Sequence, residues 1–424
     1  MDRATRLASG SVVSELVVWF GERIVGKLEL TEPGVIRLTY ERRWLDDVAS
    51  FPISISLPLR AAPFEQEAAA YFANLLPEGD ARAAVCAKLG ISLGNDVALL
   101  RALGGECAGA LTLLEPGSRP PDPQLYSYEL LDHRRLARLV KHEVVPLLAA
   151  GATTRLSLAG AQDKLPVAVL DGDLHLALEG APSTHILKLP HPHFAHLPLN
   201  EGFVMGLART IGFDVAATEV LTRTDPPSLL VERYDRVHGE EITRLHQEDL
   251  CQALALSASQ KYEQEGGPSV ARAVEVLTLH AQRPIVDARR VMEWQAFNVV
   301  AGNCDGHGKN LSLLYTGRTI RLAPFYDLVS TRHYPRLDRN LAMSVGGRRE
   351  PTELHAAHWK QLATDVGLGA RIVLDAVRGV AERVLDALPE WVTEYRRRVG
   401  RRAILQALPT EITKNARRVL RQLR

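Results

Sequence analysis

The sequence has few cysteines, and they do not lie at paired spacings. Four are scattered over 424 residues, at Cys86, Cys107, Cys251 and Cys304. A disulfide framework or a cysteine-ligated zinc site needs cysteines at short, repeated spacings. We therefore expect reduced thiols in a cytoplasmic protein, with neither disulfides nor a zinc site built on cysteine.

The sequence also lacks an excess of one charge and any long apolar run. Its 51 Lys and Arg residues nearly balance 50 Asp and Glu residues, which excludes a uniformly basic nucleic-acid binder but allows a local patch. No stretch is long and apolar enough to span a bilayer, and the N-terminus lacks a signal-peptide pattern. With 46% hydrophobic residues, the chain suits a well-packed soluble protein of two or three domains.

The order of predicted elements divides the chain into three parts. Residues 1–120 are rich in short strands and form a β-rich N-terminal domain. A tract at 115–124, EPGSRPPDPQ, is the richest in proline and glycine and is the predicted linker. Residues 121–246 are mostly strands with one helix. Residues 247–424 are mostly helical, because from Gln247 on the apolar residues recur every three to four positions.

The middle part combines features that phosphate binding requires. A loop of small residues at 155–164 precedes a predicted hairpin, and a short strand at 184–190 carries Lys188 among apolar neighbours. The helix predicted at 200–212 carries Glu201. A strand lysine can bring a positive charge to phosphates, and a helix carboxylate can orient that lysine. Taken alone, Lys188 would be an ordinary exposed lysine on an edge strand.

Residues 305–310, DGHGKN, crowd polar side chains between a helical run and a strand. Asp, Gly and Asn are also ordinary turn formers, so this stretch alone does not define a site. However, Asp305 precedes Asn310 by five residues, which is the D-x-x-x-x-N spacing of kinase catalytic loops. In those loops the Asp accepts the substrate hydroxyl proton and the Asn binds metal. A second hairpin would bring Asp327 back beside Asn310, where both could hold magnesium.

Several stretches carry one family's pattern together. They are SLAGAQDK (157–164), THILKLP (184–190), VERYDR (231–236), HQEDLCQALAL (246–256), KYEQEGGP (261–268), DGHGKN (305–310) and PFYDLVS (324–330). Through them the chain resembles the HipA toxin kinases, the serine/threonine kinases of bacterial toxin–antitoxin pairs. The resemblance covers nearly the whole chain. It implies an α+β, two-lobed protein-kinase-like fold with an added β-rich N-terminal domain and a mainly helical C-terminal lobe.

The resemblance also implies roles for individual residues, with ATP and Mg²⁺ as cofactors. Asp305 would be the catalytic base, and Asn310 and Asp327 would hold magnesium. At Gly308 we expect alanine from the family pattern, and the change should loosen the turn only slightly. The implied ATP-binding residues are Ala159, Gly160, Ala161, Gln162, Asp163, Lys164, Lys188, Glu232, Arg233, Tyr234, His307, Gly308, Lys309, Asn310, Tyr326, Asp327, Leu328 and Val329.

Regulation and partners follow from the same resemblance. Ser157 matches the position at which these kinases phosphorylate themselves, and its phosphate would add about −1.5 to −2 charges beside the ATP phosphates. We expect this modification to expel the loop and switch the enzyme off. The implied partner is a helix-turn-helix antitoxin, similar to HipB, that sits on operator DNA. The implied substrate is an aminoacyl-tRNA synthetase, glutamyl-tRNA synthetase above all, whose phosphorylation would stop translation and growth.

The C-terminal tail is distinctly basic. Residues 395–424 contain ten basic residues and one acid. A solvated helix face is the ordinary explanation for such a tail. Since the antitoxin would bring DNA nearby, we hypothesise an auxiliary contact of Arg396, Arg397 and Arg398 with the DNA backbone, which would weaken with salt.

Four alternative interpretations remain open, are weak or fail. The chain could be a small-molecule kinase, although its N-terminal domain and Ser157 motif argue against that, or a co-repressor that has lost catalysis. The histidines of HPHFAHLP, at 191–198, suggest zinc only weakly, because no Cys or acid is near and two prolines mark a loop. His355 and His358 lie three apart rather than four, so they do not form a metalloprotease motif.

Overall fold

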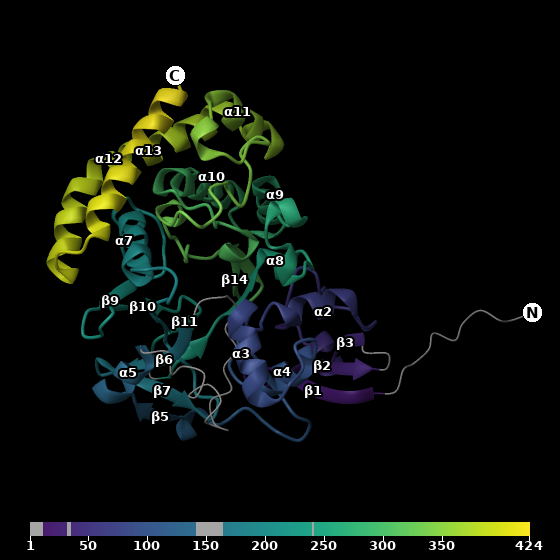
Figure 1. Ribbon diagram of the computed structural model, residues 1–424. Coiled ribbons are helices and arrows are strands. Elements are labelled where there is room, and N and C mark those ends of the chain that lie inside the picture. Colours follow the sequence, from purple (N-terminus) through teal and green to yellow (C-terminus); the bar gives the residue numbers. More distant parts are fainter. Residues whose placement is uncertain (1–11, 32–34, 141–163, 240) are drawn as a thin grey trace, which may run out of the picture.

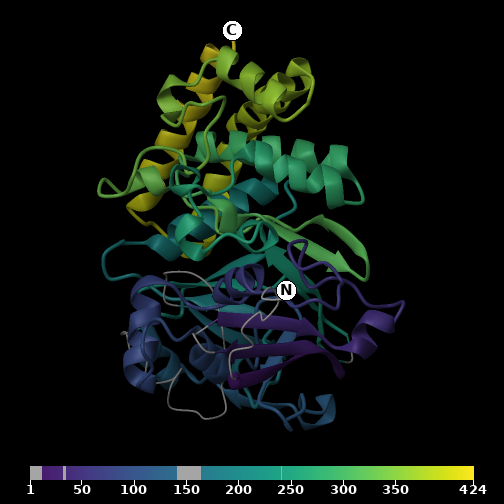
Figure 2. The same ribbon diagram turned by 90° about the vertical axis from the view of Figure 1, so that its right-hand side faces the viewer.

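The computed structural model describes residues 12–31, 35–140, 164–239 and 241–424 (Figure 1). The predicted loop residues 155–163, with Ser157 and residues Ala159 to Asp163, lie outside the described residues. The molecule has three parts. An N-terminal domain and a six-stranded sheet lie side by side, and a helical lobe lies over both of them (Figures 1 and 2). Within the described residues, no helix is long and apolar enough to cross a membrane.

The N-terminal domain contains an antiparallel sheet of order β3-β2-β1-β4, covered by short helices. Aromatic side chains fill its core, where Trp44, Phe51 and Phe64 are buried. The predicted β-rich character of this part is therefore present in the structure. Its elements are β1 (Val12–Phe20), β2 (Arg23–Thr31), β3 (Val35–Tyr40), α1 (Arg42–Asp46), α2 (Gln66–Ala73), α3 (Gly79–Leu89), α4 (Asp96–Leu103) and β4 (Leu111–Leu114).

The second sheet has six strands in the order β5-β7-β6-β8-β10-β9, with one long helix, α7 (Leu197–Thr210), packed against it. The helix predicted at 200–212 begins three residues earlier because Pro198 is tolerated in a first turn. The strands and the remaining helix are β5 (Ser127–Leu130), α5 (His133–Val140), β6 (Lys164–Leu170), β7 (Asp173–Leu178), β8 (His185–Lys188), β9 (Thr218–Leu221) and β10 (Ser228–Glu232).

The helical lobe contains one small sheet, of which the sequence interpretation predicted two strands and missed the third. Residues from Gln247 on, which we assigned to a helical segment, begin in strand β13 (His246–Asp249), which pairs with β14 (Ser312–Thr316). That prediction was wrong because the pairing partner lies more than sixty residues away, beyond the reach of local periodicity. The helix follows only at α8 (Leu250–Ala253), which the Asp249 side chain caps by accepting from the Gln252 N–H.

The rest of this lobe is helical, as predicted. Before this lobe, β11 (Arg236–Val237) pairs with β12 (Thr243–Arg244). The lobe itself continues through α9 (Val270–His280), α10 (Pro284–Ala301), β15 (Thr319–Leu322), α11 (Ala356–Asp365), α12 (Ala370–Val399) and α13 (Ile404–Gln422). The predicted second hairpin is β14 with β15. Helix α10 is buried over most of its length and lies between α9, α12 and α13, so it forms the centre of the lobe.

Helix α12 holds α7 in place through close contacts. The Trp391 indole N–H donates to the Phe203 carbonyl at 3.0 Å, and the Tyr395 hydroxyl donates to the Leu199 carbonyl at 2.8 Å. Gly206 permits this approach, since a Cβ there would lie 2.1 Å from the Trp391 ring. These contacts fix the orientation of the helix that carries Glu201.

A buried charge network joins the N-terminal domain to the segment that follows β10. The Glu106 carboxylate accepts from Arg233 at 3.1 Å and from Arg236 at 2.9 Å. Asp235 pairs with both arginines at 2.9 and 3.0 Å. All four side chains are nearly inaccessible to solvent, so the two negative charges balance the two positive ones away from water.

We predict that Glu106→Gln destabilises the whole protein, because it leaves two buried guanidinium groups sharing a single carboxylate. Removing one partner of a buried ion pair costs about 3–5 kcal/mol. Urea-induced unfolding measures this loss. Glu115→Gln is the matched control, because Glu115 is more than half exposed and its pair with Arg101 should contribute less than about 1 kcal/mol. An equal, small effect of both substitutions would contradict the role of the network.

Candidate active site

The centre of the site is Lys188, at the end of β8. Its ammonium group contacts Glu201 on α7 at 2.6 Å and Asp327, which follows β15, at 2.6 Å. Glu201 and Lys188 are buried, whereas the Asp327 side chain is 42% exposed. The sequence interpretation placed these three residues in one site, and the structure brings them into direct contact. The pair of a strand lysine with a helix glutamate matches the arrangement that protein kinases require.

The charges of Lys188 and Asp327 support each other, whereas burial raises the pKa of Glu201 to about 7. Burial works against the charge of Lys188, yet Asp327 and Glu201 raise its pKa above the ordinary lysine value. Burial likewise works against the charge of Asp327, but Lys188 and Lys164 hold its pKa well below the usual range. Lys188 therefore keeps its proton, and Asp327 stays ionised, at neutral pH.

Asp327 adopts an unusual backbone conformation beside the loop that carries Asn310. Its φ of 59° lies in the left-handed region, where Asp is one of the few side chains tolerated. Two backbone hydrogen bonds fix the preceding Phe325: its N–H donates to the Asp214 carbonyl, and its carbonyl accepts from Ala216, both at 2.9 Å. The Asn310 side-chain amide donates to Asp327 at 3.2 Å. Such strain, maintained by the surroundings, is typical of functional sites.

The loop at 305–310 follows the C-terminus of α10, which Gly302 ends in a left-handed conformation. The Asp305 carboxylate is exposed and accepts a hydrogen bond of 2.7 Å from the Tyr262 hydroxyl. The Asn310 side-chain oxygen accepts from the His307 N–H at 3.0 Å, which closes the loop on itself. The loop thus presents one carboxylate to solvent and turns the Asn310 amide toward Asp327.

His307 lies near both Asp305 and Asp327. Its imidazole is buried, and burial lowers its pKa, so the ring is neutral at pH 7. Both Asp305 and Asp327 are near enough to act on it electrostatically. The direct contacts join Lys188 to Asp327 and Asn310 to Asp327, whereas the Asp305 carboxylate contacts Tyr262.

Gly308 is held more tightly than the sequence interpretation assumed. A Cβ at this position would lie 2.5 Å from the Pro268 ring and 3.1 Å from the Cys251 sulfur. Glycine in place of the expected alanine is therefore not a loosened turn in this chain. It is the residue that the packing of the loop against Pro268 requires.

The predicted hinge residues have different side-chain surroundings. The Glu232 side chain is about half exposed, whereas the Arg233 guanidinium is committed to the buried network with Glu106. The Tyr234 ring lies 5.7 Å from the Tyr326 ring. The Tyr326 hydroxyl donates to the Lys309 carbonyl at 2.6 Å. Tyr326 thus contacts both the predicted hinge residue Tyr234 and the loop at 305–310.

Other predicted nucleotide-site residues lie at the edges of this region or in the core. Lys164 begins β6 directly opposite Lys188 in the strand register, and burial together with Lys188 lowers its pKa to about 8. Leu328 and Val329 follow Asp327 but are buried, and Leu328 packs within the main hydrophobic core. The burial of these two side chains therefore supports the backbone segment that carries Asp327.

The side chain of Lys309 points to the N-terminal domain. Its ammonium donates to the backbone carbonyl of Asn74 at 3.1 Å and to the Asn74 side-chain oxygen at 2.8 Å, and it pairs with Glu78 at 3.0 Å. The sequence interpretation did not identify Asn74 or Glu78 as part of the site. Both residues lie in the stretch NLLPEG (74–79), and nothing in its local pattern indicates a contact with the loop at 305–310.

The donor atoms near Asp327 suit a hard cation. Mg²⁺ prefers oxygen ligands and usually takes one or two from the protein, with phosphates and water completing its shell. Asp327 offers a partly exposed carboxylate, and Asn310 offers an amide beside it. In the described parts of the chain, His, Cys, Asp and Glu side chains form no group of three that could hold a metal alone. The site therefore fits a metal that arrives with a nucleotide.

Comparison with known proteins agrees with this geometry. The model of the HipA-like C-terminal domain matches residues 156–388, and the model of the HipA N-terminal domain matches residues 16–114. The chain belongs to the HipA family of serine/threonine-protein kinase toxins. The protein Y4mE of Sinorhizobium fredii, named as a kinase, is 41% identical over 89% of this chain and 91% of its own.

Two further comparisons concern the HipA toxin of Shewanella oneidensis. The toxin sequence is 29% identical to this HipA-family chain over 88% of each. A solved complex of that HipA with HipB and operator DNA superposes with a TM-score of 0.82, at 26% identity and over 96% of this chain and 97% of that one. The predicted α+β, two-lobed kinase-like fold is thereby confirmed. The family's kinase activity implies the use of ATP.

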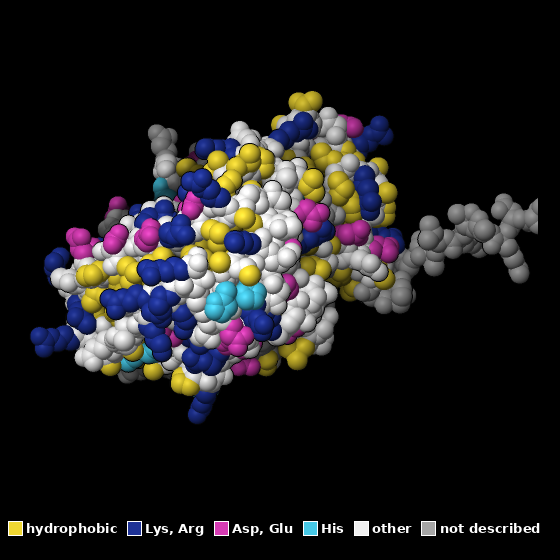
Figure 3. All heavy atoms as spheres, turned by 90° about the horizontal axis from the view of Figure 1, so that it is seen from above, with side chains coloured by type: hydrophobic (Ala, Val, Ile, Leu, Met, Phe, Trp, Pro, Cys, Tyr) yellow, Lys and Arg dark blue, Asp and Glu magenta, His cyan; other side chains and the backbone are white. Residues whose placement is uncertain are grey.

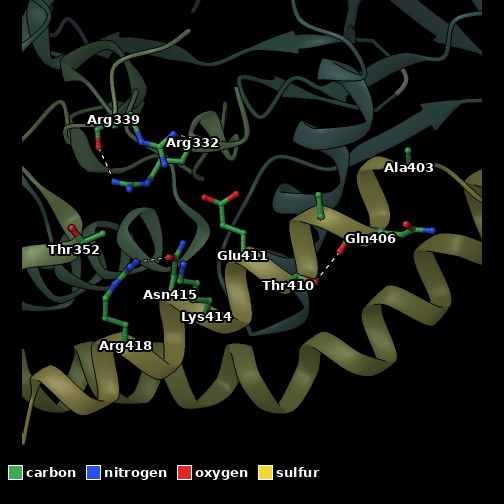
Figure 4. A pocket seen from close by; sticks show the side chains of 11 residues that line it. Arg332, Arg339, Thr352, Ala403, Gln406, Thr410, Glu411, Lys414, Asn415 and Arg418 are labelled. Atoms are coloured by element: carbon green, nitrogen blue, oxygen red, sulfur yellow. Dashed lines mark hydrogen bonds between the residues drawn. The ribbon is translucent and has the colours of Figure 1, made fainter. Parts of the chain in front are cut away.

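The basic tail of this HipA-family kinase forms the end of α12 and all of α13. Figure 3 shows many Lys and Arg side chains on the face that these helices share. An open pocket of about 620 Å³ lies beside α13, and its charged lining residues are Arg332, Arg339, Glu411, Lys414 and Arg418 (Figure 4). Arg332 is already paired with Glu350 at 3.1 Å, so the cations Arg339, Lys414 and Arg418 face the acid Glu411 in this pocket.

We predict that Gly308→Ala destabilises this HipA-family kinase and distorts its catalytic loop. The added methyl group would overlap the Pro268 ring, and overpacking of this kind costs about 1–3 kcal/mol. Thermal unfolding and a phosphorylation assay measure the two effects. Gly94→Ala is the control, because nothing lies within 4 Å of a Cβ at that position. Wild-type stability in Gly308→Ala would contradict the close packing.

Proposed function

We propose that this chain transfers the γ-phosphate of ATP, with Mg²⁺, to a serine or threonine hydroxyl of a protein. The observation that carries the proposal is the contact of Lys188 with both Glu201 and Asp327, beside the Asn310 amide. A buried, protonated lysine held by a helix carboxylate can bind ATP phosphates through charge. The Asp305 carboxylate is exposed, and in this proposal it would accept the proton of the substrate hydroxyl.

In this proposal each residue has one task. Lys188 neutralises the phosphates, and Asp305 accepts the hydroxyl proton while the hydroxyl oxygen bonds to the γ-phosphorus and the bond to ADP breaks. The Tyr262 hydroxyl orients Asp305 through its 2.7 Å hydrogen bond. Asp327 and Asn310 would hold Mg²⁺, which would neutralise the developing phosphate charge. Residues 159–164 would contact the phosphates through their backbone, with the hinge at 232–234 beside adenine.

The partner and the target belong to the same proposal. The solved complex of Shewanella HipA contains HipB and operator DNA, which supports a HipB-like helix-turn-helix antitoxin as the partner of this chain. DNA would then be reached through that antitoxin. We propose an aminoacyl-tRNA synthetase, glutamyl-tRNA synthetase first, as the cytoplasmic substrate whose phosphorylation inhibits translation. This target rests on the family resemblance alone.

The structure divides the three proposed DNA contacts at the end of α12. Arg396 donates to the Leu405 carbonyl at 2.9 Å, and Arg398 pairs with Glu394 and lies over the Trp391 ring. Arg397 is exposed and carries no such contact within the described residues. Arg397 is therefore the member of the group best placed for a DNA phosphate.

Replacement of the proposed base provides the central test. We predict that Asp305→Gln retains ATP affinity, because the Lys188 contacts are untouched, and loses phosphate transfer by about 10²–10⁴-fold. Transfer of labelled γ-phosphate in a lysate is the measurement, with Asp386→Asn on the exposed side of α12 as the control. A labelled metabolite instead of a labelled protein would favour a small-molecule kinase. No turnover in the wild type would favour a co-repressor that has lost catalysis.

The proposed autophosphorylation of Ser157 gives a second test. We predict that Ser157→Asp lowers ATP affinity, since a negative charge next to the proposed phosphate loop repels the triphosphate. Ser157→Ala should keep the affinity of the unmodified protein, and intact mass after incubation with ATP should show one phosphate fewer than in the wild type. Full ATP affinity in Ser157→Asp would rule out this mode of inactivation.

A further inference from the structure

Glu78 of the N-terminal domain contacts two lysines, one in the catalytic loop and one in a segment that contacts this loop. One carboxylate oxygen pairs with Lys309 at 3.0 Å, and the other accepts from Lys261 at 2.9 Å. Lys309 belongs to the loop at 305–310, whereas Lys261 precedes α9. A single acid from a separate domain thus bridges two segments of the helical lobe.

The segment that contains Lys261 also contacts the loop that carries Asp305 and Lys309. The Lys261 carbonyl accepts from the Gly308 N–H at 3.0 Å. The next residue, Tyr262, donates its hydroxyl hydrogen to the Asp305 carboxylate at 2.7 Å. Glu78 therefore reaches Asp305 by two routes, one through the loop backbone from Lys309 and one through Lys261 and Tyr262.

The contacts of Glu78 with the two lysines are shielded from water, and Asn74, a further acceptor for Lys309, is held in place by its own hydrogen bond. The side chains of Glu78, Lys309 and Lys261 are 15%, 6% and 19% exposed. Asn74, the other partner of Lys309, ends α2 and donates its side-chain amide to the Leu256 carbonyl at 2.8 Å. Within the described residues, the other acid near Lys309 is Asp249, at 3.7 Å. Removing one partner of a shielded pair of this kind leaves the other charge without compensation.

We propose that Glu78 is a positioning residue of the kinase site: through Lys309 and Lys261, the N-terminal domain holds the catalytic loop in the shape that aims Asp305. The inference rests on the proposed function and deepens it. The N-terminal domain then takes part in phosphate transfer without touching nucleotide or substrate. Misplacing a catalytic group by about 1 Å can cost about 10²-fold in rate.

The ionisation of Glu78 is consistent with this role. Burial disfavours its charge, but Lys309 and Lys261 outweigh burial and lower its pKa to about 2. Glu78 is therefore ionised at every pH at which the kinase would work, and the contact with both lysines is continuous. Within the described residues, the ion pairs of Glu78 involve Lys261 and Lys309 but not Lys188, the residue proposed to neutralise the ATP phosphates, so an effect on kcat can be compared with an effect on KM for ATP.

Glu78→Gln in the full-length chain tests the proposal. The substitution keeps the size of the side chain but removes the charge that holds both lysines. We expect kcat to fall by about 10- to 100-fold, with KM for ATP changed by less than about twofold. Amide hydrogen exchange of residues 303–311 should become faster. Asp80→Asn is the matched control, since it removes an exposed acid two residues away and should change neither quantity.

A second variant separates positioning from mere domain attachment. Lys309→Met should lower kcat to a similar extent, and the Glu78→Gln/Lys309→Met double variant should be little worse than either single one, because the two residues act as one unit. Unchanged kcat and unchanged loop exchange in Glu78→Gln, with or without a lower Tm, would overturn the proposal. If the wild type itself transfers no phosphate, the proposed function fails, and the exchange measurement alone decides whether Glu78 holds the loop.

Discussion

The contact of Lys188 with Glu201 and Asp327 is the constraint on which the rest of the site depends. It joins β8, α7 and the segment after β15, which lie up to 139 residues apart in the sequence. A buried lysine without these acids would lose its charge or its place in the fold. The sheet, α7 and the Asp327 backbone must therefore hold fixed positions relative to one another. The packing of α12 on α7 and the backbone hydrogen bonds of Phe325 keep them in place.

The N-terminal domain is bound to the kinase lobes by charge as well as by apolar packing. Glu106 reaches the arginines that follow the hinge strand, and Glu78 reaches the lysines around the catalytic loop. The main hydrophobic core is also continuous from this domain into the helical lobe. The chain thus places one acid of the same domain at each of the two regions that a kinase must keep aligned. The additional domain therefore contributes charged contacts to both of these regions.

The parts of the site that could be predicted were those with a local pattern. The interval from Asp305 to Asn310, the lysine in a short apolar strand and the acid after a hairpin are each visible within a few residues, and their family pattern located them together. Glu78 and Glu106 could not be found in this way, because an isolated acid in a sequence carries no sign of the distant cation that it will meet. Strand β13 was missed for the same reason, since its partner lies more than sixty residues away. The need for glycine at position 308 likewise depends on Pro268, a neighbour in space only.

The position of α12 has a consequence for communication across the molecule. Trp391 and Tyr395 donate hydrogen bonds to backbone carbonyls of α7, and the arginines at 396–398 follow directly on the same helix. A macromolecule that displaced this arginine-bearing end would transmit force to the element that carries Glu201. If binding of that macromolecule changed the affinity for nucleotide by some factor, then bound nucleotide would change the affinity for the macromolecule by the same factor.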